Sequence, residues 1–335
     1  MLKFYKSLFF STMIFSTLMA ISSYSWFSIW ISLEINLLSI IPLMTDSSNS
    51  FSSESALKYL ITQIFASIIL LFSIIALMKI QEYLLVLPLN MFNMMLNTSL
   101  LIKMGAAPFH FWVPEVAEGL NWNLNFLMLT WQKIAPIIIL MYFLNSNFFL
   151  MIVIVVSSMV SGIMGLNQLS LRKIMAYSSI NHLAWMLGSI LSSYSTWLIY
   201  FLIYSITSLL IMKTFHYLNI LYLSQLYNSL EKNKFLIILI SLLFFSMAGI
   251  PPFLGFFPKW LIIMNLTYMN QFMTTFLMII FTLIVLSFYL RLIIYPLMFA
   301  KNEMILYKTY KYYWMYWNKL IILLMFPINS LIFIN

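Results

Sequence analysis

The chain has 335 residues, of which 63% are hydrophobic and only 7% charged, and its formal net charge is +9. A soluble protein carries about 25% charged residues, so this composition excludes a soluble globular fold and a soluble basic domain for nucleic acid. Cys is absent, which excludes disulfides, cysteine-ligated iron–sulfur clusters and thiolate zinc sites.

Apolar runs of about 20 residues, long enough to cross a bilayer, recur along the whole chain. They lack the alternation of a barrel strand, so helices are expected. The predicted fold is an all-α polytopic membrane protein, a single transmembrane domain over residues 1–335. The eleven predicted spans lie near residues 3–23, 25–44, 56–78, 84–107, 123–144, 148–167, 174–191, 195–218, 235–264, 272–298 and 318–334, and the longest polar interruptions are 45–55, 114–121, 223–234 and 300–318.

Basic residues between the spans are distributed unevenly. When the spans alternate in direction, eleven Lys and Arg fall on the amino-terminal side and only Lys79 on the other. The positive-inside rule then predicts that the amino terminus faces the matrix or cytoplasm and the carboxyl terminus the opposite side. The first ten residues contain two Lys and no Arg, so no transit peptide is expected, and the bias toward Ile, Phe, Asn, Met, Tyr and Lys suggests synthesis inside an organelle.

One proline-containing pattern occurs twice. Residues Gly105–Pro114 and Gly249–Pro258 both read G-x-x-P-F-x-x-x-x-P, at an offset of 144 residues. The two copies fall in the fourth and ninth predicted spans, and an odd separation means that they cross the membrane in opposite directions. Paired broken helices in inverted repeats are where transporters place ion sites.

Six ionisable residues fall inside predicted spans, and each costs about 2.5–3.5 kcal/mol at a helix centre, so a partner or a function is expected for them. Lys213 is most simply a residue near the basic interface, and Arg291 a structural partner. The other four are Glu34, Lys103, Lys133 and Lys259.

These four residues suggest proton transfer. Glu34 lies too deep to reach water, so it is either half of a static ion pair or a protonatable switch. Lys103 precedes the first proline break and Lys259 follows the second, and the alternative for both is snorkelling to a headgroup. Lys133 lies beside Pro136, which removes a backbone hydrogen bond and can open the helix. Burial allows a Lys to gain or lose a proton near neutral pH.

Two histidines can extend such a path. His110 follows the first break, and His182 lies well inside its span. Histidine titrates closest to neutrality and suits a proton relay; the alternative for His110 is an ordinary interface residue. The three His of the chain are too scattered for a metal site, and no glycine-rich phosphate loop is present.

Five ordered motifs cover roughly residues 25 to 295: Trp30–Asn36, Lys103–Pro114, Thr130–Pro136, Gly165–Lys173 and Gly249–Trp260. Together they resemble the subunit 2 family of mitochondrial NADH dehydrogenase, respiratory complex I. The composition resembles that of an insect or another arthropod. The resemblance implies an antiporter-like subunit with two inverted five-helix repeats, about 1–145 and 146–299, each with a discontinuous helix, followed by a carboxyl-terminal helix at about 318–334.

The resemblance also implies roles and surroundings. Glu34 would be the charge partner, Lys103 the pumping lysine, Lys133 the connecting lysine and Lys259 the outlet lysine. His110 and His182 fall in matching motifs and would join the proton path. No cofactor is expected in this chain, because NADH, FMN, iron–sulfur clusters and ubiquinone would lie in other subunits.

The expected partners are other membrane-arm subunits, including neighbouring antiporter-like subunits, and inner-membrane lipids such as cardiolipin, with no nucleic acid. The expected location is the mitochondrial inner membrane, with the amino terminus in the matrix and the carboxyl terminus toward the intermembrane space. The predicted function is proton translocation coupled to electron transfer from NADH to ubiquinone. Two alternatives remain at this stage: a structural membrane-arm scaffold, and a cation/proton antiporter.

Overall fold

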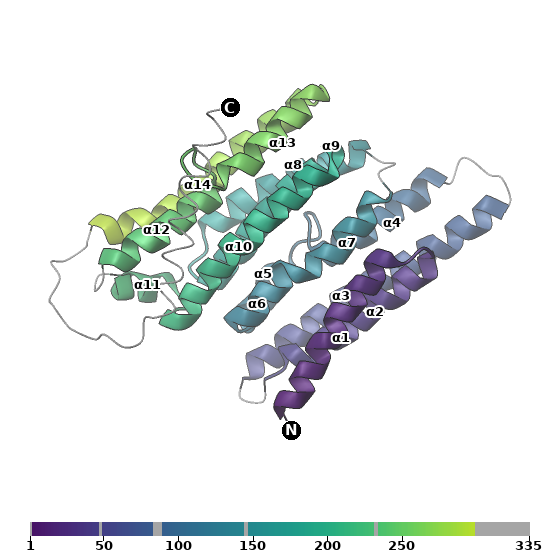
Figure 1. Ribbon diagram of the computed structural model, residues 1–335, viewed down its shortest axis with the longest axis horizontal. Coiled ribbons are helices and arrows are strands. Elements are labelled where there is room, and N and C mark those ends of the chain that lie inside the picture. The colour runs from purple at the N-terminus through teal and green to yellow at the C-terminus, as the bar shows by residue number, and fades with distance from the viewer. Residues whose placement is uncertain (1, 47–48, 83–88, 144–146, 231–233, 299–335) are drawn as a thin grey trace. The chain divides into compact units, whose positions relative to one another are not determined.

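The structure is a computed structural model that describes residues 2–46, 49–82, 89–143, 147–230 and 234–298 (Figure 1). Within these ranges the chain is helical, with no strand and one isolated bridge between Ser170 and Tyr222. The helices are α1 Leu2–Ser22, α2 Trp26–Met44, α3 Ser50–Glu82, α4 Leu89–Met104, α5 Trp112–Gly119, α6 Trp122–Leu129, α7 Trp131–Met141, α8 Asn147–Leu166, α9 Leu171–Ser192, α10 Tyr194–Leu218, α11 Leu223–Leu230, α12 Lys234–Ala248, α13 Phe256–Tyr268 and α14 Phe272–Met298.

The predicted all-α membrane fold is confirmed. In the described ranges, seven helical segments are long and apolar enough to cross a bilayer. The helix α9 is not one of them, although a span was predicted at 174–191. Its polar side chains, among them Ser178, Ser179 and His182, are buried, and α9 packs against α10, α13 and α14. Contact with other helices lets these polar side chains avoid lipid.

The chain divides into two compact units, residues 1–156 and residues from 157 onward. In the first unit α1 packs on α2 and α7, α2 on α3, α3 on α4 and α5, and α4 on α7. In the second unit α9 packs on α10 and α13, while α12 packs on α10 and α14. Each unit therefore contains one of the two proline-containing patterns.

Both patterns interrupt a helix in the same way. Gly105 follows α4 with a φ of +73°, and Gly249 follows α12 with a φ of +80°, a left-handed conformation that Gly adopts without a side-chain clash. The next residue then donates its N–H back into the last helical turn, as in a Schellman motif. These bonds run from Ala106 to the Leu101 carbonyl at 3.0 Å and from Ile250 to the Phe245 carbonyl at 3.4 Å. The repeated sequence pattern thus encodes a repeated local structure.

Several predicted boundaries are wrong. The predicted interruption at 114–121 is largely the helix α5, because Pro114 lies in its first turn, where a missing N–H costs nothing, and Val116 and Ala117 are buried. Likewise, much of the predicted interruption at 223–234 is the helix α11, whose Leu223 and Leu226 are buried. The predicted span at 235–264 is two helices, α12 and α13, and the break between them lies at the proline-containing pattern, as predicted. The predicted span at 318–334 lies outside the described residues.

The fifth predicted span is interrupted, but not at its proline. Pro136 lies inside α7, whereas the interruption is at Thr130, between α6 and α7. Thr130 has a φ of −117° and a ψ of −69°, and its hydroxyl donates to the Phe126 carbonyl at 2.7 Å. The irregular turn thus lies three residues before Lys133, on its amino-terminal side.

The two break glycines are expected to resist substitution. An alanine at either position would adopt a left-handed backbone at a cost of about 1–2 kcal/mol. In Gly105→Ala the added methyl group would also overlap Val113, and in Gly249→Ala it would lie 2.8 Å from Cδ of Lys259. Both variants should lower the melting temperature of the assembled subunit. Gly188→Ala in α9 is the matched control, because its methyl group would meet neighbours at an ordinary 3.5 Å; equal effects at all three positions would contradict this account.

Candidate functional site

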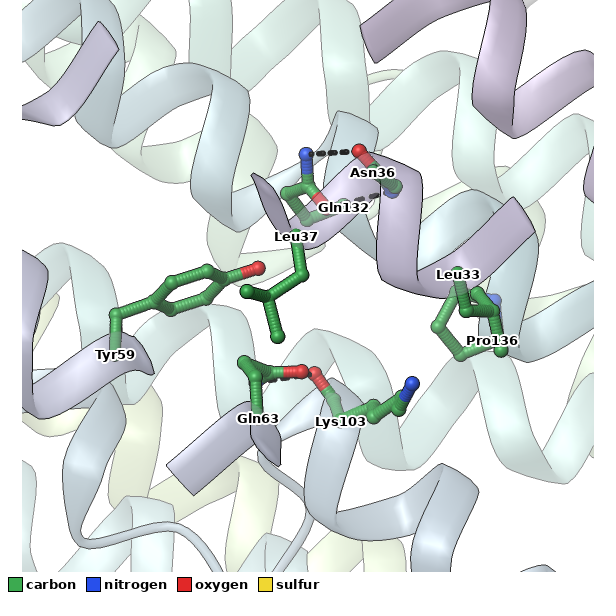
Figure 2. Close-up of a pocket in the computed structure, with 8 residues that line it drawn as sticks. All are labelled: Leu33, Asn36, Leu37, Tyr59, Gln63, Lys103, Gln132 and Pro136. Carbon is green, nitrogen blue, oxygen red and sulfur yellow. Dashed lines mark hydrogen bonds between the residues drawn. The ribbon is translucent and has the colours of Figure 1, made fainter. Parts of the chain in front are cut away.

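A small buried cavity in the first unit lies where α2, α3, α4 and α7 meet (Figure 2). Its volume is about 20 Å³, which is room for about one water molecule. The lining is mixed: the side chains come from Leu33, Asn36, Leu37, Tyr59, Gln63, Lys103, Gln132 and Pro136. A lysine, two amides of an interhelical pair and a third amide therefore share one enclosed space inside the helix bundle.

Among the residues that the structure describes, Lys103 is the only charged one that lines this cavity. It lies in the last turn of α4, directly before the Gly105 break, and it is 7% exposed. Its side chain extends toward Leu33 and Pro136 in Figure 2, and its ammonium is buried without a hydrogen-bond partner in the described part of the chain. Snorkelling therefore does not describe Lys103 in this unit, because the ammonium stays inside it.

Glu34 lies near Lys103 without a direct ion pair. The carboxylate is close enough for an electrostatic interaction with the Lys103 ammonium, but no ion pair within 4.0 Å joins the two in the described ranges. One carboxylate oxygen, Oε1, is buried without a hydrogen-bond partner there. Two opposite charges held near each other and not locked together can respond to each other's protonation state.

The carbonyl groups at the end of α4 are satisfied by neutral donors. The indole N–H of Trp112 donates to the Ile102 carbonyl at 3.2 Å, and the Gln63 amide donates to the Lys103 carbonyl at 3.4 Å. These bonds stabilise the interrupted helix end. The ammonium of Lys103 is thus not needed as a cap for its own helix.

Asn36 and Gln132 form a reciprocal amide pair across α2 and α7. Asn36 Nδ2 donates to Gln132 Oε1 at 3.0 Å, and Gln132 Nε2 donates to Asn36 Oδ1 at 3.2 Å. Neither residue was predicted from the sequence as part of the site. Both are amides inside apolar spans, and each lies close in sequence to a candidate charge: Gln132 is next to Lys133, and Asn36 is two residues after Glu34. This proximity was the signal that could have identified them. The pair fixes α2 against α7 beside the cavity.

Lys133 and His110 complete the predicted residues of the first unit. Lys133 is 3% exposed and lies in the first turn of α7, after the irregular turn at Thr130. It is not among the residues that line the cavity, but Gln132 beside it is. His110 lies between α4 and α5, and its Nδ1 donates to the Pro108 carbonyl at 3.2 Å, while Nε2 is buried without a partner in the described ranges.

Lys259 has a different environment in the second unit. It lies in the first turn of α13, and its ammonium donates to the Ala248 carbonyl at 2.6 Å and the Met247 carbonyl at 3.4 Å. A cation at these carbonyls stabilises the negative end of the α12 dipole. The ammonium also lies 5.8 Å from the ring centre of Trp185. The second half of this broken helix thus caps the first half with a charge.

His182 contacts two buried tyrosines in the second unit. Its Nδ1 lies 2.7 Å from the Tyr200 hydroxyl, and its ring centre lies 4.8 Å from that of Tyr204. The three residues also line a cavity of about 10 Å³ that reaches Met247 and Pro258 at the α12–α13 break. The tyrosines were missed in the sequence analysis, because tyrosine is frequent in this chain and nothing in the spacing distinguishes these two.

The two other charges that were predicted inside spans are both partly exposed. Arg291 of α14 donates to the carbonyls of Leu166 at 2.7 Å and Gln168 at 2.9 Å, so it is a structural partner that caps the end of α8. Lys213 lies five residues before the end of α10, and its place near an interface stays a prediction.

Comparison with known proteins gives the class first. The family profile for NADH:quinone oxidoreductase/Mrp antiporter membrane subunits matches residues 23–287. A solved structure of respiratory complex I from Thermus thermophilus with bound aureothin contains a chain of the same fold, with a TM-score of 0.83 and 21% identity, covering 97% of this chain and 78% of that one. Helices broken by glycine and proline around buried lysines therefore belong here to an antiporter-like membrane protein.

Two sequence relatives identify the family within this class of antiporter-like membrane proteins. NADH-ubiquinone oxidoreductase chain 2 of Anopheles gambiae is 48% identical, over 91% of this chain and 90% of that protein. The protein of the same name from Aedes aegypti is 46% identical, over 92% of each chain. The chain belongs to the NADH-ubiquinone oxidoreductase chain 2 family, which confirms the resemblance found in its motifs.

The amide pair provides a test of the first site. Asn36→Leu leaves the buried Gln132 amide without its partner, whereas adding Gln132→Met to it replaces both amides by apolar groups. Interhelical hydrogen bonds in membranes contribute about 0.6 kcal/mol each and up to about 1.7. We therefore expect the single variant to be less heat-resistant than the double variant, with a coupling of about 1–2 kcal/mol in thermal unfolding of the assembled subunit. Additive losses in the double variant would contradict a direct pair.

Proposed function

We propose that this chain translocates protons as an antiporter-like subunit of respiratory complex I, driven by electron transfer from NADH to ubiquinone in other subunits. The observation that carries the proposal is the environment of Lys103. Its ammonium is buried in a cavity at a broken helix, has no hydrogen-bond partner in the described residues and lies near Glu34. An ammonium held in this way can release or accept a proton with little rearrangement around it.

The proposed sequence begins in the first unit. A signal from the redox reaction changes the interaction of Glu34 with Lys103, and a proton leaves Lys103 or a water beside it. The cavity supports this step, since it contains Lys103 and has room for about one water. Gln132 and Pro136 of α7 line the same cavity, and Lys133 follows Gln132 in the chain. Lys133 is then the next proton carrier. His110, whose Nε2 is buried, is the histidine that joins the proton path in the first unit.

Lys259 and His182 are the proposed carriers of the second half. Both are buried and lie at or beside the cavity near the α12–α13 break. The proton passes from Lys133 toward Lys259 in this scheme. Because Lys259 caps α12 through two carbonyls, loss of its proton would weaken the cap, so the protonation state and the helix break are coupled.

We assign the cellular setting as part of the same proposal. We place the chain in the mitochondrial inner membrane beside other membrane-arm subunits, including other antiporter-like subunits, and in contact with lipids such as cardiolipin. NADH, FMN, iron–sulfur clusters and ubiquinone are assigned to other subunits. The amino terminus is assigned to the matrix and the carboxyl terminus to the intermembrane space, on the distribution of basic residues in the sequence.

A structural scaffold is the second candidate function, and one observation favours it. Lys259 and Arg291 both cap helix ends through backbone carbonyls, a stabilising task that needs no proton transfer. A scaffold predicts that neutral variants of buried charges lose assembly, whereas a pump predicts that they assemble and lose proton transfer. Lys103 argues for the pump, because its ammonium caps no carbonyl in the described ranges.

Lys133→Met is the direct test of the pump. Methionine fills a similar volume in a buried position but cannot carry a proton. In an assembled complex reconstituted into liposomes, we expect the proton-pumping rate to fall about tenfold or more, since a relay group contributes about 10²–10⁴ in rate. NADH oxidation, pumped protons and the amount of assembled complex would be measured together. Lys79→Met, at the exposed end of α3, is the matched control and should pump normally. Unchanged proton stoichiometry in Lys133→Met would remove the assigned role.

A further inference from the structure

A buried group of tyrosines surrounds one side of α9 in the second unit. Tyr200 and Tyr204 come from α10 and Tyr289 from α14, and all three are at most 3% exposed. They lie close enough to one another for electrostatic interaction. On α9 they meet His182 together with Ser178 and Ser179, which lie next to the Tyr289 and Tyr204 hydroxyls respectively.

Packing alone does not account for two of these three tyrosines. A phenylalanine would fill the same space without a hydroxyl, and a buried hydroxyl is unfavourable unless it has a hydrogen-bond partner. The chain uses phenylalanine 30 times, including Phe288 and Phe244 beside Tyr289. The hydroxyl of Tyr289 has no hydrogen-bond partner in the described part of the chain. The hydroxyls of Tyr200 and Tyr204, which meet His182 and Ser179 on α9, therefore indicate a hydrogen-bonding task.

Tyr200 and His182 are in direct hydrogen-bond contact. The hydroxyl of Tyr200 lies 2.7 Å from Nδ1 of His182, and both side chains are buried. A tyrosine hydroxyl can donate to an unprotonated ring nitrogen or accept from a protonated one, so the contact holds the imidazole in place in either tautomer. Tyr200 thus sets the orientation of the His182 ring.

The same group lies beside the second broken helix. His182, Tyr200 and Tyr204 line the cavity of about 10 Å³ together with Met247 and Pro258, and this volume is close to the smallest that holds a water. Met247 supplies one of the two carbonyls bound by Lys259, and Pro258 precedes Lys259 in the chain. His182, Tyr200 and Tyr204 therefore lie beside the environment of Lys259.

We propose that Tyr200 is a positioning residue for His182, and that its hydroxyl holds the imidazole in the orientation required for proton transfer beside the α12–α13 break. The proposal rests on the proposed function, since it assigns Tyr200 to the same proton path. Tyr200 acts through His182 and carries no proton of its own across the membrane in this scheme.

The test is a double-mutant cycle in the assembled complex, reconstituted into liposomes. Tyr200→Phe keeps the ring and removes the hydroxyl. We expect coupled turnover to fall about three- to tenfold, as for the loss of one buried hydrogen bond, with normal amounts of assembled complex. In a His182→Gln background the same change should have almost no effect, because the residue through which Tyr200 acts is already lost. The pH profile of turnover should change in Tyr200→Phe as well.

Tyr194→Phe is the matched control. It lies on the same helix, α10, is exposed, and should leave turnover and its pH profile as in the unchanged protein. If Tyr200→Phe lowers turnover equally with and without His182→Gln, the effect is structural and the proposal fails. If Tyr200→Phe has no effect while His182→Gln impairs pumping, Tyr200 does not position His182, although the proposed function stands. If pumping survives both changes, this proposal fails, and Lys133→Met alone decides the proposed function.

Discussion

Lipid offers no hydrogen-bond partner to a helix end, and this constraint governs both broken helices. Each break exposes backbone carbonyls inside the membrane, where leaving them unpaired costs several kcal/mol each. The chain meets the requirement from within, because a left-handed glycine turns the chain so that a later side chain reaches back over the helix end. Trp112 does so at α4 and Lys259 at α12. The position of Lys259 at the end of α12 follows from the second of these turns.

The two helix breaks have the same backbone conformation at their glycines, but different side chains cap the two helix ends. At the offset of 144 residues, Lys259 corresponds to Glu115, and Lys103 corresponds to Met247. Glu115 points to the surface ion pairs of the first unit and bonds Lys58 at 2.9 Å, whereas Lys259 turns inward to cap its helix. The first break therefore has a neutral cap and an unengaged ammonium, and the second has a charged cap. A lysine that is already bound to carbonyls holds its proton differently from one beside a carboxylate.

Much of the fold was predictable from the sequence, and the breaks were too. Hydropathy identified the helices, and the paired G-x-x-P-F patterns located both interruptions. The burial of Lys103, Lys133 and Lys259 was also predicted. A charged side chain inside a long apolar span is expected to face the interior of the helix bundle and not the lipid. The roles of these lysines as proton carriers stay predictions.

Other features needed the coordinates. The Asn36–Gln132 pair joins residues 96 positions apart, and no periodicity connects two amides on different helices. The helix interruption was predicted at Pro136, because proline is the residue in this segment that commonly breaks a helix. The irregular turn lies instead at Thr130, six residues before that proline. The three tyrosines around His182 could not be predicted, because the chain contains 20 tyrosines. Only burial and contacts in the structure distinguish these three from the others. Where a function depends on which side chains meet, the pattern along one helix is insufficient.

The helix α9 has a consequence for how the protein is made. Its polar side chains are stable only when neighbouring helices surround them, and it does not reach the apolar character of a bilayer-crossing segment, whereas α8 and α10 on either side of it in the chain do. A helix that partitions poorly from the insertion machinery into lipid needs hydrophobic companions to enter with it. We therefore expect α9 to enter the membrane together with α10, so that the polar residues around His182 also affect how the chain is inserted.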